Sequence, residues 1–204
     1  MKFEGRYDAA MKMIPLLSKY KKDEGVVLAV PRGGVPIGFY IAKEYSFPLE
    51  LLLTKKIGFP GNSELAIGAV GLENEVIDER FDISQEYIES EIKKIRKSLQ
   101  ERYKKFMGDR QPIDLKDKTV IIVDDGIATG NTIIASIKMI RTKQPRKIVV
   151  AVPVAPERTA AKIRDLVDDF ICAYIPDEFF GVGQFYDDFS QVSDEEVIKL
   201  LQRA

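Results

Sequence analysis

Short runs of aliphatic and β-branched residues alternate along this chain with amphipathic segments of helical length, and that alternation restricts the fold more than any other feature. Apolar runs of this length without polar alternation are typical of strands buried on both faces of a sheet. The predicted strands cover residues 26–30, 49–54, 119–123, 147–152 and 169–173, and the predicted helices between them cover residues 35–44, 131–143 and 157–166. This order predicts an α/β fold with right-handed βαβ units and one central parallel sheet.

Three segments depart from the alternation. Residues 55–81 are rich in glycine and contain short extended runs at 65–70 and 75–77, which predicts a flexible β-hairpin suited to act as a lid. Residues 84–107 carry apolar side chains every three or four positions, which predicts a long helix that packs on its own sheet or serves a dimer interface. Residues 176–204 predict an aromatic-rich tail and a terminal helix opened by Ser193. We expect one domain over residues 1–204.

The composition excludes several classes of enzyme. The chain has no histidine, so it can form no Ser-His-Asp triad, histidine base or histidine-ligated zinc site. Its one cysteine, Cys172, lies in an apolar run and indicates a buried thiol in a reducing compartment. Without a signal peptide or an apolar run of about 20 residues, we expect a cytoplasmic protein with no membrane partner. A net charge of -1 argues against a nucleic-acid partner.

The most specific motif is VIIVDDGIATGNT, residues 120–132, in which an apolar strand is followed by two acids, a short loop and the start of a helix. Backbone N–H groups and threonine hydroxyls in such a loop can converge on a phosphate at the positive end of the helix. The residues predicted to bind this phosphate are Ala128, Thr129, Gly130, Asn131 and Thr132. Asp124 and Asp125 end the strand, where they can accept hydrogen bonds from ribose hydroxyls or help to hold a metal.

This motif resembles the signature by which type I phosphoribosyltransferases bind 5-phosphoribosyl-1-pyrophosphate (PRPP). The resemblance implies a Rossmann-like central parallel sheet flanked by helices, which carries a flexible β-hairpin lid over 55–81 and a small C-terminal hood over 176–204. It implies a single phosphoribosyltransferase domain over 1–204 that acts as a homodimer in nucleotide metabolism. It also implies Mg²⁺ as the cofactor, with hard oxygen ligands.

Two further segments lie where that family places its pyrophosphate site. The tetrapeptide PRGG, residues 31–34, resembles the family's pyrophosphate loop, which often contains a cis peptide, so Arg32 and Gly33 are expected to bind pyrophosphate. Lys55 and Lys56 begin the predicted lid and are expected to join them, with Lys56 in a catalytic role. The alternatives are a plain glycine-rich turn and a solvated basic pair.

The tail over residues 175–187 resembles the hood of the hypoxanthine-guanine branch, in which an aromatic ring stacks on the base and an aspartate binds a metal. By that match, Phe179 and Phe180 bind the acceptor, and Asp187 joins Asp124 and Asp125 as a metal ligand. The alternatives are an aromatic pair that belongs to the core and a solvated carboxylate.

Two departures from the 6-oxopurine branch limit what the resemblance says about the acceptor. Ala128 stands where that branch places an acid facing the purine, and the sequence VPVA, residues 152–155, lacks its base-reading lysine. The expected activity is transfer of 5-phosphoribose from PRPP to a small nitrogen acceptor, such as a nucleobase or related heterocycle, with release of pyrophosphate. The catalytic residues would be Asp124, Asp125, Arg32 and Lys56. The alternative is a PRPP-sensing regulatory protein without turnover.

Overall fold

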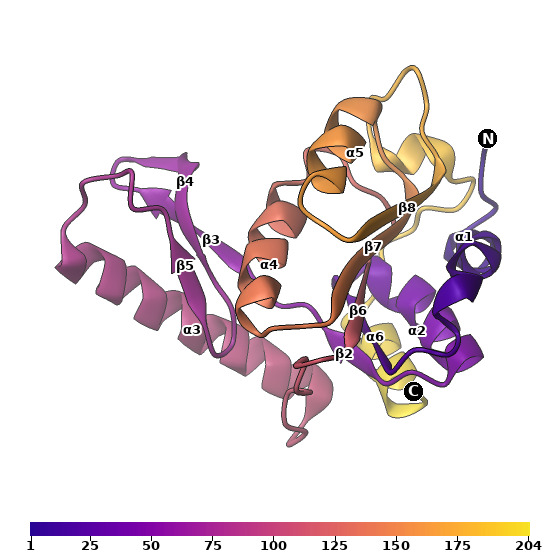
Figure 1. Ribbon diagram of the computed structural model, residues 1–204, viewed down its shortest axis with the longest axis horizontal. Helices are drawn as coiled ribbons and strands as arrows, with labels where there is room; N and C mark the ends of the chain where they lie inside the picture. Colours follow the sequence, from indigo (N-terminus) through magenta and orange to yellow (C-terminus); the bar gives the residue numbers. More distant parts are fainter.

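A five-stranded sheet forms the centre of the computed structural model, which describes residues 1–204 apart from the side chain of Glu64 (Figure 1). Its strands, in the spatial order β2-β1-β6-β7-β8, are β1 (Gly25–Ala29), β2 (Leu49–Leu51), β6 (Thr119–Val123), β7 (Lys147–Val154) and β8 (Asp169–Tyr174). Every neighbouring pair is parallel. The α/β fold with a central parallel sheet is therefore confirmed.

Both faces of this sheet are covered by helices, which explains the uninterrupted apolar runs in the sequence. Because side chains alternate along a strand, Ile121 and Val123 of β6 join one core, whereas Val120 and Ile122 join the other. The first core includes α1 (Arg6–Met13), α2 (Gly34–Tyr45) and α6 (Asp194–Gln202), and the second includes α4 (Asn131–Thr142) and α5 (Glu157–Arg164). Figure 1 shows the two groups of helices on opposite sides of the sheet.

A second, antiparallel sheet extends away from the central one beside the long helix α3 (Gln85–Met107) (Figure 1). Its strands, in the order β3-β4-β5, are β3 (Lys55–Phe59), β4 (Asn62–Val70) and β5 (Glu75–Ile77). The extended runs at 65–70 and 75–77 belong to β4 and β5. The sequence did not indicate β3, because two lysines and a glycine weaken its strand pattern and only pairing with β4 makes it a strand.

The N-terminal segment and the C-terminal tail lie side by side. The backbone N–H of Phe3 donates to the carbonyl oxygen of Phe185 (2.8 Å), and the N–H of Asp187 donates to the carbonyl oxygen of Phe3 (2.8 Å). The tail contains the short helix η2 (Val182–Phe185), and a second short helix, η1 (Ile14–Tyr20), follows α1.

Cys172 is half-buried rather than fully buried, and its burial raises the pKa of the thiol to about 11. Within the described part of the chain, no helix is both long and apolar enough to span a bilayer.

The turn between β4 and β5 is attached to the C-terminal half of α4. The side-chain amide of Asn74 donates to the carbonyl oxygen of Met139 (3.0 Å) and to Oγ1 of Thr142 (2.8 Å). Beside it, the ammonium group of Lys143 pairs with the carboxylate of Glu73. These contacts attach the antiparallel sheet to α4, which packs on one face of the central sheet.

Replacing Asn74 with alanine should loosen this attachment, because the variant loses two hydrogen bonds of about 1 kcal/mol each. We expect faster amide hydrogen exchange in β4 and β5 and little change in β6 and β7, since local openings need not involve the whole fold. Gln100→Ala, at an exposed position on α3, is the control. Unchanged exchange in β4 and β5 would show that Asn74 does not hold the sheet.

Candidate active site

The order of the strands marks one point at the edge of the central sheet. β1 and β6 are neighbours, but the chain continues from β1 to β2 on one side and from β6 to β7 on the other. Ligands of open α/β sheets bind at the carboxyl ends of the strands at such a point. The loops that follow β1 and β6 meet there, and the N–H of Val30 donates to the carbonyl oxygen of Val123 (2.9 Å).

These two loops touch so closely that glycine is required. A Cβ atom at Gly33 would overlap the carboxylate of Asp125, and one at Gly34 would lie 2.6 Å from the carbonyl oxygen of Val123. The peptide bond between Pro31 and Arg32 is cis, as the resemblance implies. The predicted pyrophosphate loop and the acidic pair therefore form one packed unit.

Asp125 forms an ion pair with Arg6, which the sequence analysis did not identify. Nε and Nη2 of Arg6 both donate to Oδ2 of Asp125, at 3.0 and 2.8 Å. The two side chains are only 12% and 14% exposed. Tyr186 donates its hydroxyl to the carbonyl oxygen of Asp125 (2.6 Å), and the guanidinium of Arg6 also lies over the ring of Phe189. Because 119 positions separate Arg6 from Asp125, no local sequence pattern indicates this pair.

Asp124 and Asp125 have different hydrogen-bond partners, and within the described part of the chain only Asp125 contacts the guanidinium of Arg6. The N–H of Asp125 donates to Oδ1 of Asp124 (2.8 Å), whereas the direct guanidinium contacts go to Asp125. Burial, and then the charge of Asp125, raise the pKa of Asp124 well above its ordinary value of 3.8. Burial also raises the pKa of Asp125, and Arg6 opposes that effect. One guanidinium thus serves two acids, so the site favours a ligand with positive charge or hydroxyl donors.

The loop after the acidic pair is held in place by hydrogen bonds to β7 and α5. Thr159 donates its hydroxyl to the carbonyl oxygen of Ala128 (2.7 Å), and the N–H of Ile127 donates to the carbonyl oxygen of Val154 (2.9 Å). Gly130 adopts a positive φ of 75° directly before α4, and a Cβ atom there would lie 2.7 Å from Cγ2 of Thr159. The loop is therefore fixed at the positive end of a 12-residue helix, which suits an anion.

A cleft of about 1230 Å³ opens between this loop and the antiparallel sheet. It brings together three residues of the predicted phosphate loop (Thr129, Asn131 and Thr132) and both predicted lid lysines (Lys55 and Lys56). Loop and lysines are far apart in the sequence, yet they line one space.

Two further cations line the cleft and were missed by the sequence analysis. Lys138 lies seven residues after Asn131, so helical periodicity could have placed it on the same face of α4. The side chain of Arg80 donates two hydrogen bonds to Asp78 and its backbone N–H donates a third, and these contacts lower the pKa of Asp78 to about 2. No sequence signal distinguished Arg80 from an ordinary loop arginine.

Arg32, Phe179 and Phe180 are predicted site residues that do not line this cleft. Nη1 of Arg32 lies 3.4 Å from Oδ1 of Asp194 at the start of α6. The ring of Phe179 stacks on Phe185, with 5.5 Å between centroids, whereas Phe180 is 89% exposed.

Asp187 pairs with Lys2, and the structure does not bring it into a cluster with Asp124 and Asp125. Within the residues that the structure describes, no group of three or more acids or cysteines could hold a metal ion.

The parallel sheet, the paired loops at its switch point and the glycine-containing loop before α4 together define the fold of a phosphoribosyltransferase. The sequence profile of the phosphoribosyl transferase domain matches residues 6–190, and the chain belongs to this family.

Two proteins from strains of Mycobacterium tuberculosis, provisionally named phosphoribosyl transferases, are 36% identical to it over 207 residues. The match covers 99% of this chain and 47% of each relative, so the chain spans about half the length of these relatives.

Solved structures agree with this fold. The crystal structure of TT1426 from Thermus thermophilus is 33% identical, with a TM-score of 0.91 and coverage of 100% of this chain and 99% of that one. A hypothetical protein from Neisseria gonorrhoeae with bound ppGpp shares the fold at 13% identity and a TM-score of 0.55, over 99% of this chain and 96% of that one.

Asp124 should cost the free protein stability at neutral pH. A carboxyl whose pKa is raised on folding stabilises the fold below its ordinary pKa of 3.8, and this contribution is lost as pH rises through the raised value. Asp124→Asn keeps the acceptor for the N–H of Asp125 and removes the buried charge. We therefore expect its melting temperature to exceed that of the wild type by roughly 2–5 °C at pH 7 to 8, with the difference vanishing near pH 4.

Thermal unfolding across this pH range tests the prediction, with Asp109→Asn at an exposed position as the control. A lower melting temperature for Asp124→Asn at pH 7 would contradict it.

Proposed function

We propose that this chain transfers the 5-phosphoribosyl group of PRPP to a small nitrogen acceptor and releases pyrophosphate. The observation that carries the proposal is the cleft in which the loop before α4 faces Lys55 and Lys56. The buried acidic pair directly precedes this loop in the chain. A ligand that carries phosphate at two ends and a ribose between them matches this distribution of charge. Membership in the phosphoribosyl transferase domain family supports the same activity.

In this proposal, the loop before α4 binds the 5-phosphate. Thr129 and Thr132 contribute hydroxyls, and the backbone N–H groups of residues 128–132 contribute further donors at the positive end of the helix. Gly130 is essential because its positive φ turns the chain into the helix. The hydroxyl contact from Thr159 keeps the loop in place before the ligand arrives, which reduces the entropic cost of binding.

The acidic pair acts on the ribose. The bond from C1 to the pyrophosphate oxygen breaks, a bond from the acceptor nitrogen to C1 forms, and the acceptor releases a proton. Positive charge develops on the ring as in glycoside hydrolysis. Asp124 and Asp125 accept hydrogen bonds from the ribose hydroxyls and offset this charge. The direct guanidinium contacts of Arg6 go to Asp125, so among the residues that the structure describes the carboxyl oxygens of Asp124 have no guanidinium contact that would compete with the ribose.

Pyrophosphate leaves toward the basic residues at the other side of the site. Arg32 and Gly33 lie in the loop packed against Asp125, and Lys55 and Lys56 begin the antiparallel sheet. In the proposal, this sheet closes over the cleft as the lid and limits hydrolysis of PRPP, with Lys56 stabilising the leaving group.

Mg²⁺ is the metal that suits these residues. It is bound in proteins by one or two carboxylates together with substrate phosphates and water, and Asp124 and Asp125 supply that number of acids. When bound, it would neutralise charge on the pyrophosphate. The acids orient the ribose whether or not they contact the metal directly.

The acceptor is a nitrogen compound such as a nucleobase or a related heterocycle. In the proposal, Phe179 and Phe180 contact it from the tail. Because Phe179 stacks on Phe185, a shift of this ring would be needed before it could stack on a base. Phe180, which is exposed, is available without such a shift.

Calorimetry with PRPP and Mg²⁺, followed by pyrophosphate release with a panel of nitrogen heterocycles, tests the proposed function. Micromolar binding of PRPP and release with one acceptor would support it and identify the acceptor. Binding without release from any acceptor would favour a PRPP-sensing regulatory protein. Absence of PRPP binding would overturn the assignment of the cleft.

Thr129→Val should weaken PRPP binding roughly tenfold or more, because the variant loses a hydrogen bond to a charged phosphate at nearly constant side-chain volume. Thr129→Ser keeps the hydroxyl and is the matched control, with binding close to that of the wild type. Equal affinity of the valine and serine variants in calorimetry would remove Thr129 from the phosphate site.

Asp125→Asn should lower turnover on the order of a hundredfold while the protein remains folded, because the site loses negative charge next to the ring that becomes positive. The measurement is the rate of pyrophosphate release at saturating PRPP. Full turnover in this variant would count strongly against the proposed role of the acidic pair.

A further inference from the structure

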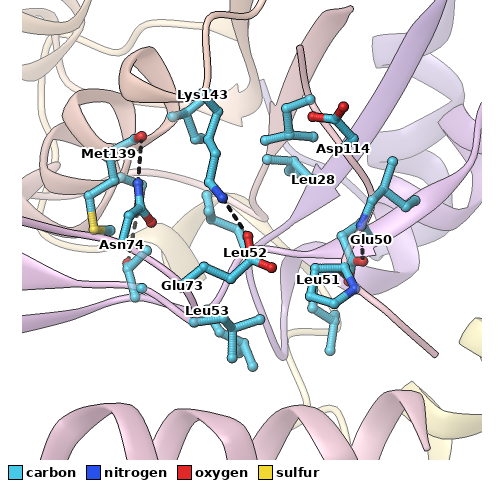
Figure 2. Close-up of a pocket in the computed structure, with 18 residues that line it drawn as sticks. Leu28, Glu50, Leu51, Leu52, Leu53, Glu73, Asn74, Asp114, Met139 and Lys143 are labelled. Carbon is cyan, nitrogen blue, oxygen red and sulfur yellow. Dashed lines mark hydrogen bonds and ion pairs between the residues drawn. The ribbon is translucent and has the colours of Figure 1, made fainter. Parts of the chain in front are cut away.

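A second cavity of about 330 Å³ shares Thr54 and helix α4 with the proposed active cleft. Figure 2 shows the residues that line it. The cavity is formed by the end of β2, the turn between β4 and β5, the C-terminal half of α4 and the segment that leads into β6. Pockets of roughly 300 to 1,000 Å³ are typical of small-molecule sites. None of the residues that line this cavity has a role in the proposed transfer reaction.

The cavity and the cleft lie on different faces of α4. Lys138 and Ala135 line the cleft, whereas Met139 and Lys143 line the cavity. Thr54 lines both spaces, and between them it donates its hydroxyl to Ser136 (2.8 Å), which in turn donates to the carbonyl oxygen of Thr132 (2.8 Å). A molecule in the cavity would therefore occupy a site of its own.

The wall of the cavity is mostly apolar. The aliphatic residues that form it include Leu28, Leu52, Leu53, Ile113, Leu115 and Ile140. Figure 2 shows Glu50 and Asp114 on one side of the cavity and Glu73, Asn74 and Lys143 on the other, with Leu28, Leu52 and Leu53 between them. Such a lining suits a flat or compact apolar body, held by a few polar groups.

Three of the polar side chains around the cavity, Glu50, Glu73 and Asp114, are carboxylic acids. Glu50 is 4% exposed, and its carboxylate accepts hydrogen bonds from the N–H of Leu51 (2.7 Å), the hydroxyl of Tyr103 (2.9 Å) and the N–H of Ile113 (3.3 Å). Oε1 takes only the first of these bonds and keeps capacity for another donor.

The charge balance of the lining disfavours an anion. The carboxylates of Asp114 and Glu73 also line the cavity, and its one basic residue, Lys143, is already paired with Glu73. An anion such as a phosphate would meet three carboxylates and an occupied ammonium group, whereas an amine would meet several acceptors.

We propose that this cavity is a second ligand site, which binds an amine-bearing heterocycle of nucleobase or nucleoside size without phosphate. The ring lies against the leucines and isoleucines, and the amino group donates to the carboxylates of Glu50 and Asp114. The bound ligand contacts the β4–β5 turn at Glu73 and Asn74, the residues that attach this turn to α4 and Lys143. Ligand binding is therefore coupled to the attachment of the antiparallel sheet.

The test uses 2-aminopurine, a fluorescent heterocycle with an amino group, in a fluorescence titration of the full chain. The wild-type chain has no tryptophan, and the emission of Leu115→Trp without the probe is subtracted as the blank for that variant. We expect saturable binding to the wild type. Leu115→Trp fills the cavity and should weaken binding at least about tenfold, because a bulky ring then occupies the ligand's volume.

Asp114→Lys provides a second variant that does not depend on repacking, since Asp114 is exposed. It should weaken binding roughly two- to fivefold through loss of an exposed charged acceptor. Asp109→Lys makes the same charge change at an exposed position outside the cavity and should leave binding unchanged. Thr129→Val, in the cleft, should also leave it unchanged.

Absence of saturable binding to the wild type would overturn the proposal. Equal affinity of the wild type, Leu115→Trp and Asp114→Lys would overturn it too, as would loss of binding in Thr129→Val with full binding in Leu115→Trp. The last result would place the probe in the cleft.

Discussion

The close contact between the loops that follow β1 and β6 is the constraint on which the rest of the site depends. Gly33 and Gly34 allow one backbone to lie against Asp125 and the carbonyl oxygen of Val123, and a Cβ atom at either position would separate them. The contact exists only because β1 and β6 are neighbours, at the point where the chain adds further strands on opposite sides of the pair. It brings the loop that contains Arg32 beside Asp124 and Asp125, so that basic and acidic residues lie within one small region.

The acidic pair illustrates how such a site is held at a cost in stability. Burial raises the pKa of both carboxyls, and one arginine from α1 compensates only part of the charge. Evolved sites often retain unfavourable groups of this kind because the ligand uses them. Here Arg6 reaches Asp125 because the N-terminal segment pairs with the tail, so that the two ends of the chain jointly cover the acids.

Helix α4 links the different parts of the molecule. The predicted phosphate loop leads into its N-terminus, one face lines the cleft, and its C-terminal half holds the β4–β5 turn through Asn74. The same half borders the second cavity. A rigid helix that contacts the loop, the antiparallel sheet and the cavity gives these regions a shared physical support.

The sequence by itself determined the parallel sheet, because buried strands read as apolar runs, and the loop over 124–132, because its acids, glycine and threonines are adjacent in the chain. Helical spacing would also have placed Lys138 beside that loop. Only the tertiary structure decided the pairing of Arg6 with Asp125, the strand β3 and the cavity around Glu50. These features join residues that are distant in the sequence, so their energies depend on packing and burial, which no local pattern encodes.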